Sequence, residues 1–357
     1  MSISSPRIGV PTGRPRNVLD VDLALQWSLQ SWTDLAGTRL RRCGEDYLGG
    51  VRVVSWNVRN RVGDAARRLG QFLAALEPRA DFVLLQEVNP AAVDSLRETA
   101  GLDWLCSSLD RRRLDRQASR RLGVAIGGAG SPKPQVLPAC TTDFPERTLA
   151  ARVRFDGRVL TLATYHAPPG VNWKLVKVQQ AVEFAKWLVA QEGPIVLGAD
   201  ANTPEVDALD FALTRTHWHS GARKLNGAAG DDVMWGPGKS HGLEDALRRW
   251  LTDRPEELAR IAALRPDGPL AVSLRTGGRG RQRSFDRRYD SVWISPAFRV
   301  GAWSTRTSSR WRLGATTRPL WSILTLPLCQ QRKWFAAERG FHPIPAICRH
   351  DPSQGGD

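Results

Sequence analysis

The sequence has no long hydrophobic run. Nowhere in its 357 residues is there a stretch of about 18 apolar side chains, close to the minimum for a membrane-spanning helix. At the N-terminus, MSISSPRIGVPTGRPRN carries basic residues but no apolar segment behind them, unlike a secretory signal. We therefore expect no membrane span and a soluble protein of the cytoplasm.

Cysteine is scarce and irregularly spaced. No Cys-x-x-Cys pair and no regular framework occurs among Cys43, Cys106, Cys140, Cys329 and Cys348. Zinc sites and disulfide-rich scaffolds need such patterns, so the sequence indicates neither. A reducing compartment is the simpler interpretation.

Acidic side chains are outnumbered. The chain holds 36 Asp and Glu against 51 Lys and Arg, which makes its formal net charge +15. Residues 51–302 alone hold 37 basic and 28 acidic side chains, a net charge of +9. This bias fits a polyanionic partner such as nucleic acid, and it fits a solvated, arginine-rich surface equally well. Charge by itself leaves the partner open.

The middle of the chain has the pattern of an α/β domain. Apolar residues make up 41% of the sequence, enough to bury a substantial core. Short apolar strands alternate with helical segments after residue 50, which predicts strands packed with helices. We predict helices over residues 64–76 and 173–190 and strands at VRVVSW, DFVLLQEV, GVAIGG, LAARVRF, VLTLATYHA, PIVLGADA and DSVWISP.

The flanking and connecting segments differ from this pattern. Residues 1–50 read as an N-terminal extension, partly disordered, with one or two helices between residues 18 and 40. The arginine-rich runs RRRLDRQASRR at 111–121 and RTGGRGRQRSFDRR at 275–288 read as loops. Each is either a solvated, mobile segment or a contact for phosphate.

Oxygen-bearing side chains stand at the ends of several predicted strands. Glu87 follows the apolar run FVLLQ, so its carboxylate lies at the mouth of a buried strand and needs a partner. Asn57 ends another strand in SWNVRN, and Asp200 and Asn202 follow a third in GADANTP. Oxygen ligands with open positions suit Mg²⁺, so the pattern predicts a site for a hard cation.

Four motifs together point to a known family. SWNVRN, LLQEV, GADANTP and RRYDSVW occur in this order over residues 51–296 and resemble the signature motifs of the endonuclease/exonuclease/phosphatase superfamily. The segment SHGLEDALRRW at 240–250 resembles the stretch that precedes the last motifs in many members. The resemblance implies a four-layer α/β/β/α sandwich, in which two mixed β-sheets pack face to face between helices.

The resemblance also implies roles for the motif residues. Glu87 resembles the principal metal ligand, and Asn57 resembles the residue that helps to hold and orient the metal. Asp200 resembles the group that positions or deprotonates the attacking water, and Asn202 the one that supports charge on the phosphoryl oxygens. Taken singly, Asn57 could be a turn residue and Asn202 part of an N-capped turn entering a helix.

A histidine of the family pattern is missing. Asp290 in RRYDSVW resembles the carboxylate that orients a catalytic histidine, and His166 stands where members place a Tyr, His or Asn that reaches toward the scissile phosphate. Alone, Asp290 could be a salt-bridge partner of Arg287 or Arg288, and His166 an ordinary strand-end residue. Members end on a Ser-Asp-His motif about 25 residues beyond this aspartate. No Asp-His pair occurs there, and the later His342 follows Phe341.

The segment after residue 302, here called the C-terminal tail (residues 303–357), looks foreign to the domain. It begins WSTRTSSRWRLGATTRPLW, with several Trp, few acidic residues and no strand alternation. Read one base earlier, codons that fit Gly314 to Pro319 can encode Ser-Asp-His-Ala-Pro. We interpret the tail as the product of a frameshift near residue 302. We expect it to leave the sheet without its last strand.

These observations predict an enzyme. The leading hypothesis is Mg²⁺-dependent, or Mn²⁺-dependent, hydrolysis of phosphate esters by a metal-activated water, with a phosphodiesterase or nuclease as the first choice. One alternative is a phosphatase for inositol phosphates, phospholipid headgroups or nucleotides. Another is an impaired or inactive member, because the Asp-His motif is missing.

Overall fold

The structure, a computed structural model, describes most of the predicted domain. The described residues are 50–111, 122–130, 133–138, 140, 142–217, 219, 221–226, 231–276, 285–305 and 320–325. The helices predicted between residues 18 and 40, the arginine-rich run at 112–121 and His342 lie outside them. Contacts divide the chain into the units Met1–Leu326 and Pro327–Asp357, and every described element belongs to the first.

The first of two six-stranded sheets is mixed. Its strands β1 and β2 are parallel, whereas β14, β4 and β3 each run antiparallel to the neighbour with which they pair. In order across the sheet, the strands are β13 (Arg299–Thr305), β14 (Leu320–Thr325), β1 (Gly50–Asn57), β2 (Phe82–Val88), β4 (Gly123–Gly128) and β3 (Trp104–Ser107).

The second sheet is also mixed. Its only parallel pair among the described strands is β7 with β8, and β12 runs antiparallel to β8. In order, its strands are β5 (Gln135–Val136), β6 (Thr148–Phe155), β7 (Arg158–His166), β8 (Ile195–Asp200), β12 (Asp290–Ile294) and β9 (Glu244–Asp245). A separate ribbon pairs β10 (Leu274–Thr276) with β11 (Phe285–Arg287).

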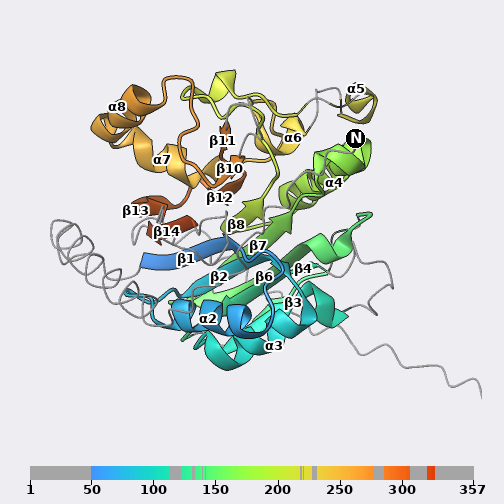
Figure 1. Ribbon diagram of the computed structural model, residues 1–357, viewed down its shortest axis with the longest axis vertical. Coiled ribbons are helices and arrows are strands. Elements are labelled where there is room, and N and C mark those ends of the chain that lie inside the picture. The colour runs from blue at the N-terminus through green and yellow to red at the C-terminus, as the bar shows by residue number, and fades with distance from the viewer. Residues whose placement is uncertain are drawn as a thin grey trace, which may run out of the picture. The chain divides into compact units, whose positions relative to one another are not determined.

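Helices cover the outer faces of both sheets (Figure 1). Against the first sheet lie α2 (Gly63–Ala74) and α3 (Pro90–Thr99), and against the second lie α4 (Gly170–Val189) and the short α6 (Asp232–Trp235). The chain between β8 and β12 also holds α5 (Ala222–Asn226), α7 (Ala246–Thr252) and α8 (Pro255–Leu264). The four-layer sandwich implied by the motifs is therefore confirmed.

Strand β2 shows why the predicted strands are apolar on both faces. Phe82 and Leu84 pack into the core between the two sheets, whereas Val83 and Leu85 pack under α2 and α3. All four side chains are fully buried, and burying one such side chain contributes about 1.5–3 kcal/mol. The run FVLLQ is thus continuous rather than alternating because a layer covers each face.

The structure corrects two expectations about the connecting segments and the tail. The run at 275–288 was predicted to be a loop, but its two ends pair as part of β10 and β11. The tail was predicted to leave the sheet without its last strand, yet it completes β13 and supplies β14, which pairs with β1 over six positions. Backbone hydrogen bonding tolerates many side-chain sequences, so weak alternation does not exclude a strand. None of the described helices is long and apolar enough to cross a membrane.

Candidate active site

The six predicted site residues come from strand ends that meet at one end of the sandwich. Asn57 is the last residue of β1, and His166 and Asp200 are the last residues of β7 and β8. In the second sheet Asp200 is the register partner of both His166 and Asp290. The parallel strands β1 and β2 end at the same edge of the first sheet, and the parallel strands β7 and β8 end at the same edge of the second. Side chains from both sheets therefore face one point.

Glu87 reaches this point through an irregularity in β2. The register between β2 and β4 shifts between Gln86 and Val88, so Glu87 is an extra residue that the ladder skips. Its φ is +55°, in the left-handed region that a residue with a Cβ rarely adopts. Such a bulge redirects a side chain, and the strain it carries is typical of functional sites. The Glu87 side chain remains 27% exposed.

Hydrogen bonds hold Asp200 from two sides. The Asn57 side chain donates from Nδ2 to Asp200 Oδ2 at 2.6 Å, and the Asn202 backbone N–H donates to Asp200 Oδ1 at 3.0 Å. Asn202 itself has φ +47° and donates from Nδ2 to the Ala167 carbonyl at 3.0 Å. Burial raises the pKa of Asp200 to about 6, although these two hydrogen bonds oppose the shift. Asp200 is thus oriented and close to its titration range at neutral pH.

His166 lies beside both carboxylates. Its Nε2 is 3.4 Å from Glu87 Oε1 and 4.0 Å from Asp200 Oδ2. Its other ring nitrogen, Nδ1, is 3.0 Å from Nη1 of Arg147. Burial, and after it the charge of Arg147, holds the pKa of His166 well below its ordinary value. The ring is therefore neutral at physiological pH.

Asp290 is buried and only partly satisfied. Its backbone N–H donates to Ser273 Oγ at 3.1 Å, but its Oδ1 has no hydrogen-bond partner among the described residues. Burial, and after it the charge of Asp200, raises the pKa of Asp290 well above its ordinary value. The alternative of an ion pair with Arg288 is wrong, because Arg288 pairs with Asp207 and Asp245.

Sequence reasoning missed several side chains that support the site. Gln86 belongs to the motif LLQEV, which predicted no role for it, yet its Nε2 donates to Thr164 Oγ1 at 3.0 Å and links the two sheets behind Glu87. Arg59 lies near Glu87 and Asp290, whose charges partly offset the lowering of its pKa by burial. Arg147 and Lys177 were not singled out either, because a lone Arg or Lys in one sequence gives no signal of burial.

The donor set suits a divalent cation. Glu87, His166 and Asp200 each offer one ligand atom, and these atoms lie within 4.8 Å of one another. Two carboxylates this close repel each other in a buried site unless a proton or a cation compensates their charge. The unpartnered Oδ1 of Asp290 adds a further buried acceptor. The residues therefore fit a metal, and carboxylate and amide oxygens favour a hard one.

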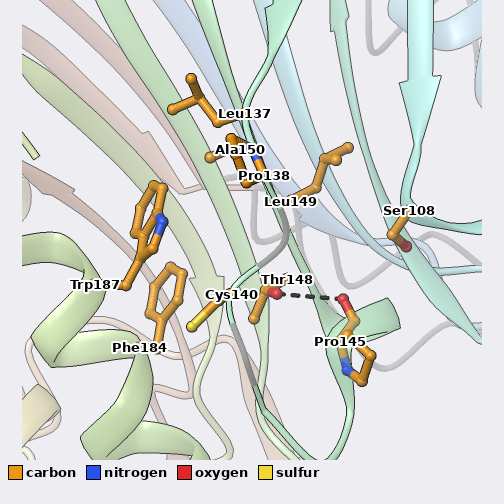
Figure 2. A pocket seen from close by; sticks show the side chains of 10 residues that line it. All are labelled: Ser108, Leu137, Pro138, Cys140, Pro145, Thr148, Leu149, Ala150, Phe184 and Trp187. Atoms are coloured by element: carbon orange, nitrogen blue, oxygen red, sulfur yellow. Dashed lines mark hydrogen bonds between the residues drawn. The ribbon is translucent and has the colours of Figure 1, made fainter. Parts of the chain in front are cut away.

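A separate cavity lies away from these residues. It has a volume of about 200 Å³ and is lined mainly by apolar side chains, among them Leu137, Phe184 and Trp187 (Figure 2). The rings of Phe184 and Trp187 stack with centroids 5.5 Å apart. None of the six predicted site residues lines this cavity. The candidate active site is the polar cluster at the strand ends.

Two packed mixed sheets with a carboxylate cluster at one end define a class of hydrolases that act on phosphate esters. The model of the endonuclease/exonuclease/phosphatase family matches residues 54–313, and the chain belongs to this family. Members are metal-dependent hydrolases of phosphoesters. The match ends just before positions 314–319, where the Ser-Asp-His motif is expected.

Solved structures share the fold at low sequence identity. TDP2 from D. rerio in complex with a single-strand DNA product matches with a TM-score of 0.52 and 15% identity, over 77% of this chain and 99% of that one. An endonuclease/exonuclease/phosphatase protein from Bacteroides vulgatus matches with a TM-score of 0.50 and 14% identity, over 78% and 99%. No curated protein matches the sequence.

Proposed function

We propose that this protein is a Mg²⁺-dependent phosphodiesterase that cleaves nucleic acid. The observation that carries the proposal is the convergence of Glu87, His166 and Asp200, whose polar side-chain atoms lie within 4.8 Å of one another, on the fold of this family. Asn57 and Glu87 would hold the metal. When bound, the metal supplies positive charge that offsets the charge developing on the phosphoryl oxygens.

The protein's own residues supply the proton transfer and the positioning. Asp200 accepts the proton of the attacking water as the water oxygen bonds to phosphorus and the bond to the leaving oxygen breaks. Its pKa of about 6 is suited to a general base near neutral pH. Asn57 keeps Oδ2 of Asp200 in place, and the Asn202 backbone N–H keeps Oδ1 in place. His166 donates a hydrogen bond to a phosphoryl oxygen.

Two observations support nucleic acid as the substrate. Residues 51–302 carry a net charge of +9, and a basic domain attracts a polyphosphate backbone. The D. rerio TDP2 structure of the same fold contains a single-strand DNA product. Asp290 keeps its proposed role of orienting a histidine, which the chain lacks at the expected position.

The test is hydrolysis by the purified chain after treatment with a chelator, with Mg²⁺, Mn²⁺ or Zn²⁺ then restored. We expect Mg²⁺ or Mn²⁺ to restore cleavage of labelled single-stranded DNA or plasmid, and Zn²⁺ not to restore it fully. Phosphate release from inositol phosphates and nucleotides is measured in parallel. Undiminished cleavage in chelator contradicts the metal mechanism. Release of phosphate from small esters without DNA cleavage contradicts the substrate assignment.

A further inference from the structure

Arg147 is a buried cation without an ion-pair partner among the described residues. It ends the 3-10 helix Pro145–Arg147, just before β6, and is only 5% exposed. The charges of Glu146, Glu87 and Asp200 offset part of the lowering of its pKa by burial. Among the described residues, however, its guanidinium takes part in none of the ion pairs, and its Nε has no hydrogen-bond partner. Burying a charge is costly unless it is paired. Packing alone therefore does not explain a buried arginine at position 147.

The contacts of Arg147 point to His166. Its Nη1 is 3.0 Å from His166 Nδ1, and both side chains are buried. On the other side, the guanidinium lies over the ring of Phe144, 5.5 Å from the ring centroid. Phe144 in turn contacts Trp173 edge to face, with centroids 4.7 Å apart. The aromatic pair thus holds the guanidinium in position beside the histidine.

A guanidinium has only donors, so Nδ1 of His166 must be the acceptor of this hydrogen bond. A nitrogen that accepts carries no proton, and the single ring proton of the neutral imidazole is then on Nε2. We propose that Arg147 is a positioning residue, which fixes His166 in the tautomer with its proton on Nε2. This tautomer follows from the hydrogen-bond geometry and does not depend on the charge of any carboxylate.

The tautomer decides what His166 can do in the proposed reaction. Nε2 is the nitrogen that faces the site, 3.4 Å from Glu87 Oε1 and 4.0 Å from Asp200 Oδ2. A protonated nitrogen has no lone pair in the ring plane for a metal, so His166 acts there as a donor. This step rests on the proposed function. In that reaction the Nε2–H group of His166 donates to a phosphoryl oxygen, and metal binding is left to oxygen ligands.

The first test is spectroscopic and needs no activity. In the full chain labelled with ¹⁵N-histidine, long-range ¹H–¹⁵N correlation distinguishes protonated from unprotonated ring nitrogens, and the variant His166→Gln identifies the signals of His166. We expect Nδ1 to be unprotonated and Nε2 to be protonated in metal-free protein. A protonated Nδ1 in the unsubstituted chain overturns the proposal, whatever the variants do.

The second test uses Arg147→Met, with Arg147→Lys as the conservative variant. We expect a proton on Nδ1 in the Met variant and an unprotonated Nδ1 in the Lys variant, which keeps a donor. An unchanged Nδ1 in the Met variant overturns the proposal. We expect kcat to fall by roughly 10²-fold in the Met variant, as for loss of one hydrogen-bond donor to the transition state, with partial recovery in the Lys variant. Equal kcat values in all three proteins also overturn it.

The third test determines whether His166 is a hydrogen-bond donor or a metal ligand. We expect the Kd for Mn²⁺ to stay within about three-fold in His166→Gln and to rise at least about ten-fold in Glu87→Gln, as is typical when a metal-site group is lost. A His166→Gln variant that loses Mn²⁺ as strongly as Glu87→Gln shows a metal ligand and overturns the proposal. If the unsubstituted chain hydrolyses nothing but has the expected tautomer, the proposed function fails while the role of Arg147 stands.

Discussion

Two carboxylates carry most of the chemistry proposed for this site. Glu87 is placed by a bulge and Asp200 by hydrogen bonds from Asn57 and Asn202. Neither side chain packs in the apolar core, so each can change to its amide with little change of shape. These two positions therefore allow a test of function with little risk to the fold.

We expect Glu87→Gln and Asp200→Asn each to lower the rate of hydrolysis by at least about 10²-fold, the scale seen when one electrostatic stabiliser is removed. The measurement is kcat on the best substrate of the metal-restored protein. Matched controls are Glu98→Gln and Asp253→Asn, both exposed, and we expect these to keep the parental rate. Near-parental turnover in either site variant would refute the site assignment.

Asp200 should also make stability depend on pH. Its pKa rises from 3.8 to about 6 on folding, so the folded state favours the protonated carboxyl. This contribution is fully present below pH 3.8 and is lost as the pH rises through about 6, a change of roughly 3 kcal/mol.

The check is denaturant unfolding of metal-free protein between pH 4 and pH 7, compared with Asp200→Asn. We expect the free energy of unfolding to fall more steeply with pH in the parent than in the variant. Saturating Mg²⁺ should reduce the difference in free energy of unfolding between the parent and Asp200→Asn at pH 7, because the cation then takes the place of the proton. Parallel pH profiles for the two proteins would contradict the prediction.

Helices α4 and α6 meet over a buried ion pair next to the site. Lys177 on α4 lies 3.1 Å from Asp231 Oδ2 at the start of α6, and neither side chain is exposed. The same ammonium donates to the Asn202 carbonyl at 2.8 Å, which ties both helices to the turn after β8. That turn carries the N–H that orients Asp200. The pair therefore links the packing of two helices to the geometry of the site.

We expect Lys177→Met to lower the free energy of unfolding by about 3–5 kcal/mol, because Asp231 is left as a buried, unpaired charge. Lys186→Met is the matched control on the same helix. Its ammonium is exposed and pairs with Glu183, so its loss should cost about 1 kcal/mol or less. Denaturant titration measures both. The double variant Lys177→Met with Asp231→Asn should recover part of the lost free energy of unfolding. A Lys177→Met variant as stable as Lys186→Met would show that the ion pair contributes little.

The C-terminal tail adds to the first sheet but does not carry the last motif of the family pattern. Its residues 320–325 pair with β1, so the first sheet gains a strand there. The sequence nevertheless has no Asp-His pair where the family pattern places one after Asp290, and Oδ1 of Asp290 has no hydrogen-bond partner among the described residues. If Asp290 has its proposed role of orienting a histidine, a frameshift near residue 302 would leave this carboxylate without that histidine.

We predict that restoring the frame near codon 302 yields a chain with Ser-Asp-His-Ala-Pro and a hydrolysis rate at least about 10²-fold higher, since a charged donor to the transition state is regained. The nucleotide sequence is the first measurement. A stop codon before position 314 in the earlier frame, or no Asp-His there, removes the frameshift hypothesis. Replacing the restored histidine by Ala is the control and should return the rate to that of the present chain.

The sequence alone was sufficient for the architecture, and it predicted strand-end residues that the structure brings together. Continuous apolar strands such as FVLLQ reveal burial on both faces, and four ordered motifs predict Asn57, Glu87, Asp200 and Asp290 as site residues. These features are local, because each depends on neighbouring residues in one strand and the turn after it. The bulge at Glu87 was not predictable, because its register is set by pairing with β4.

Contacts between distant segments were decided by the tertiary structure. The hydrogen bond from Arg147 to His166 joins residues 19 positions apart, and the bond from Asn57 to Asp200 joins residues 143 apart. The ion pair of Lys177 with Asp231 is of the same kind. No spacing or periodicity in one chain encodes such partners, because they meet only after two sheets and their helices have packed. The tautomer of His166 and the pKa of Asp200 follow from that packing.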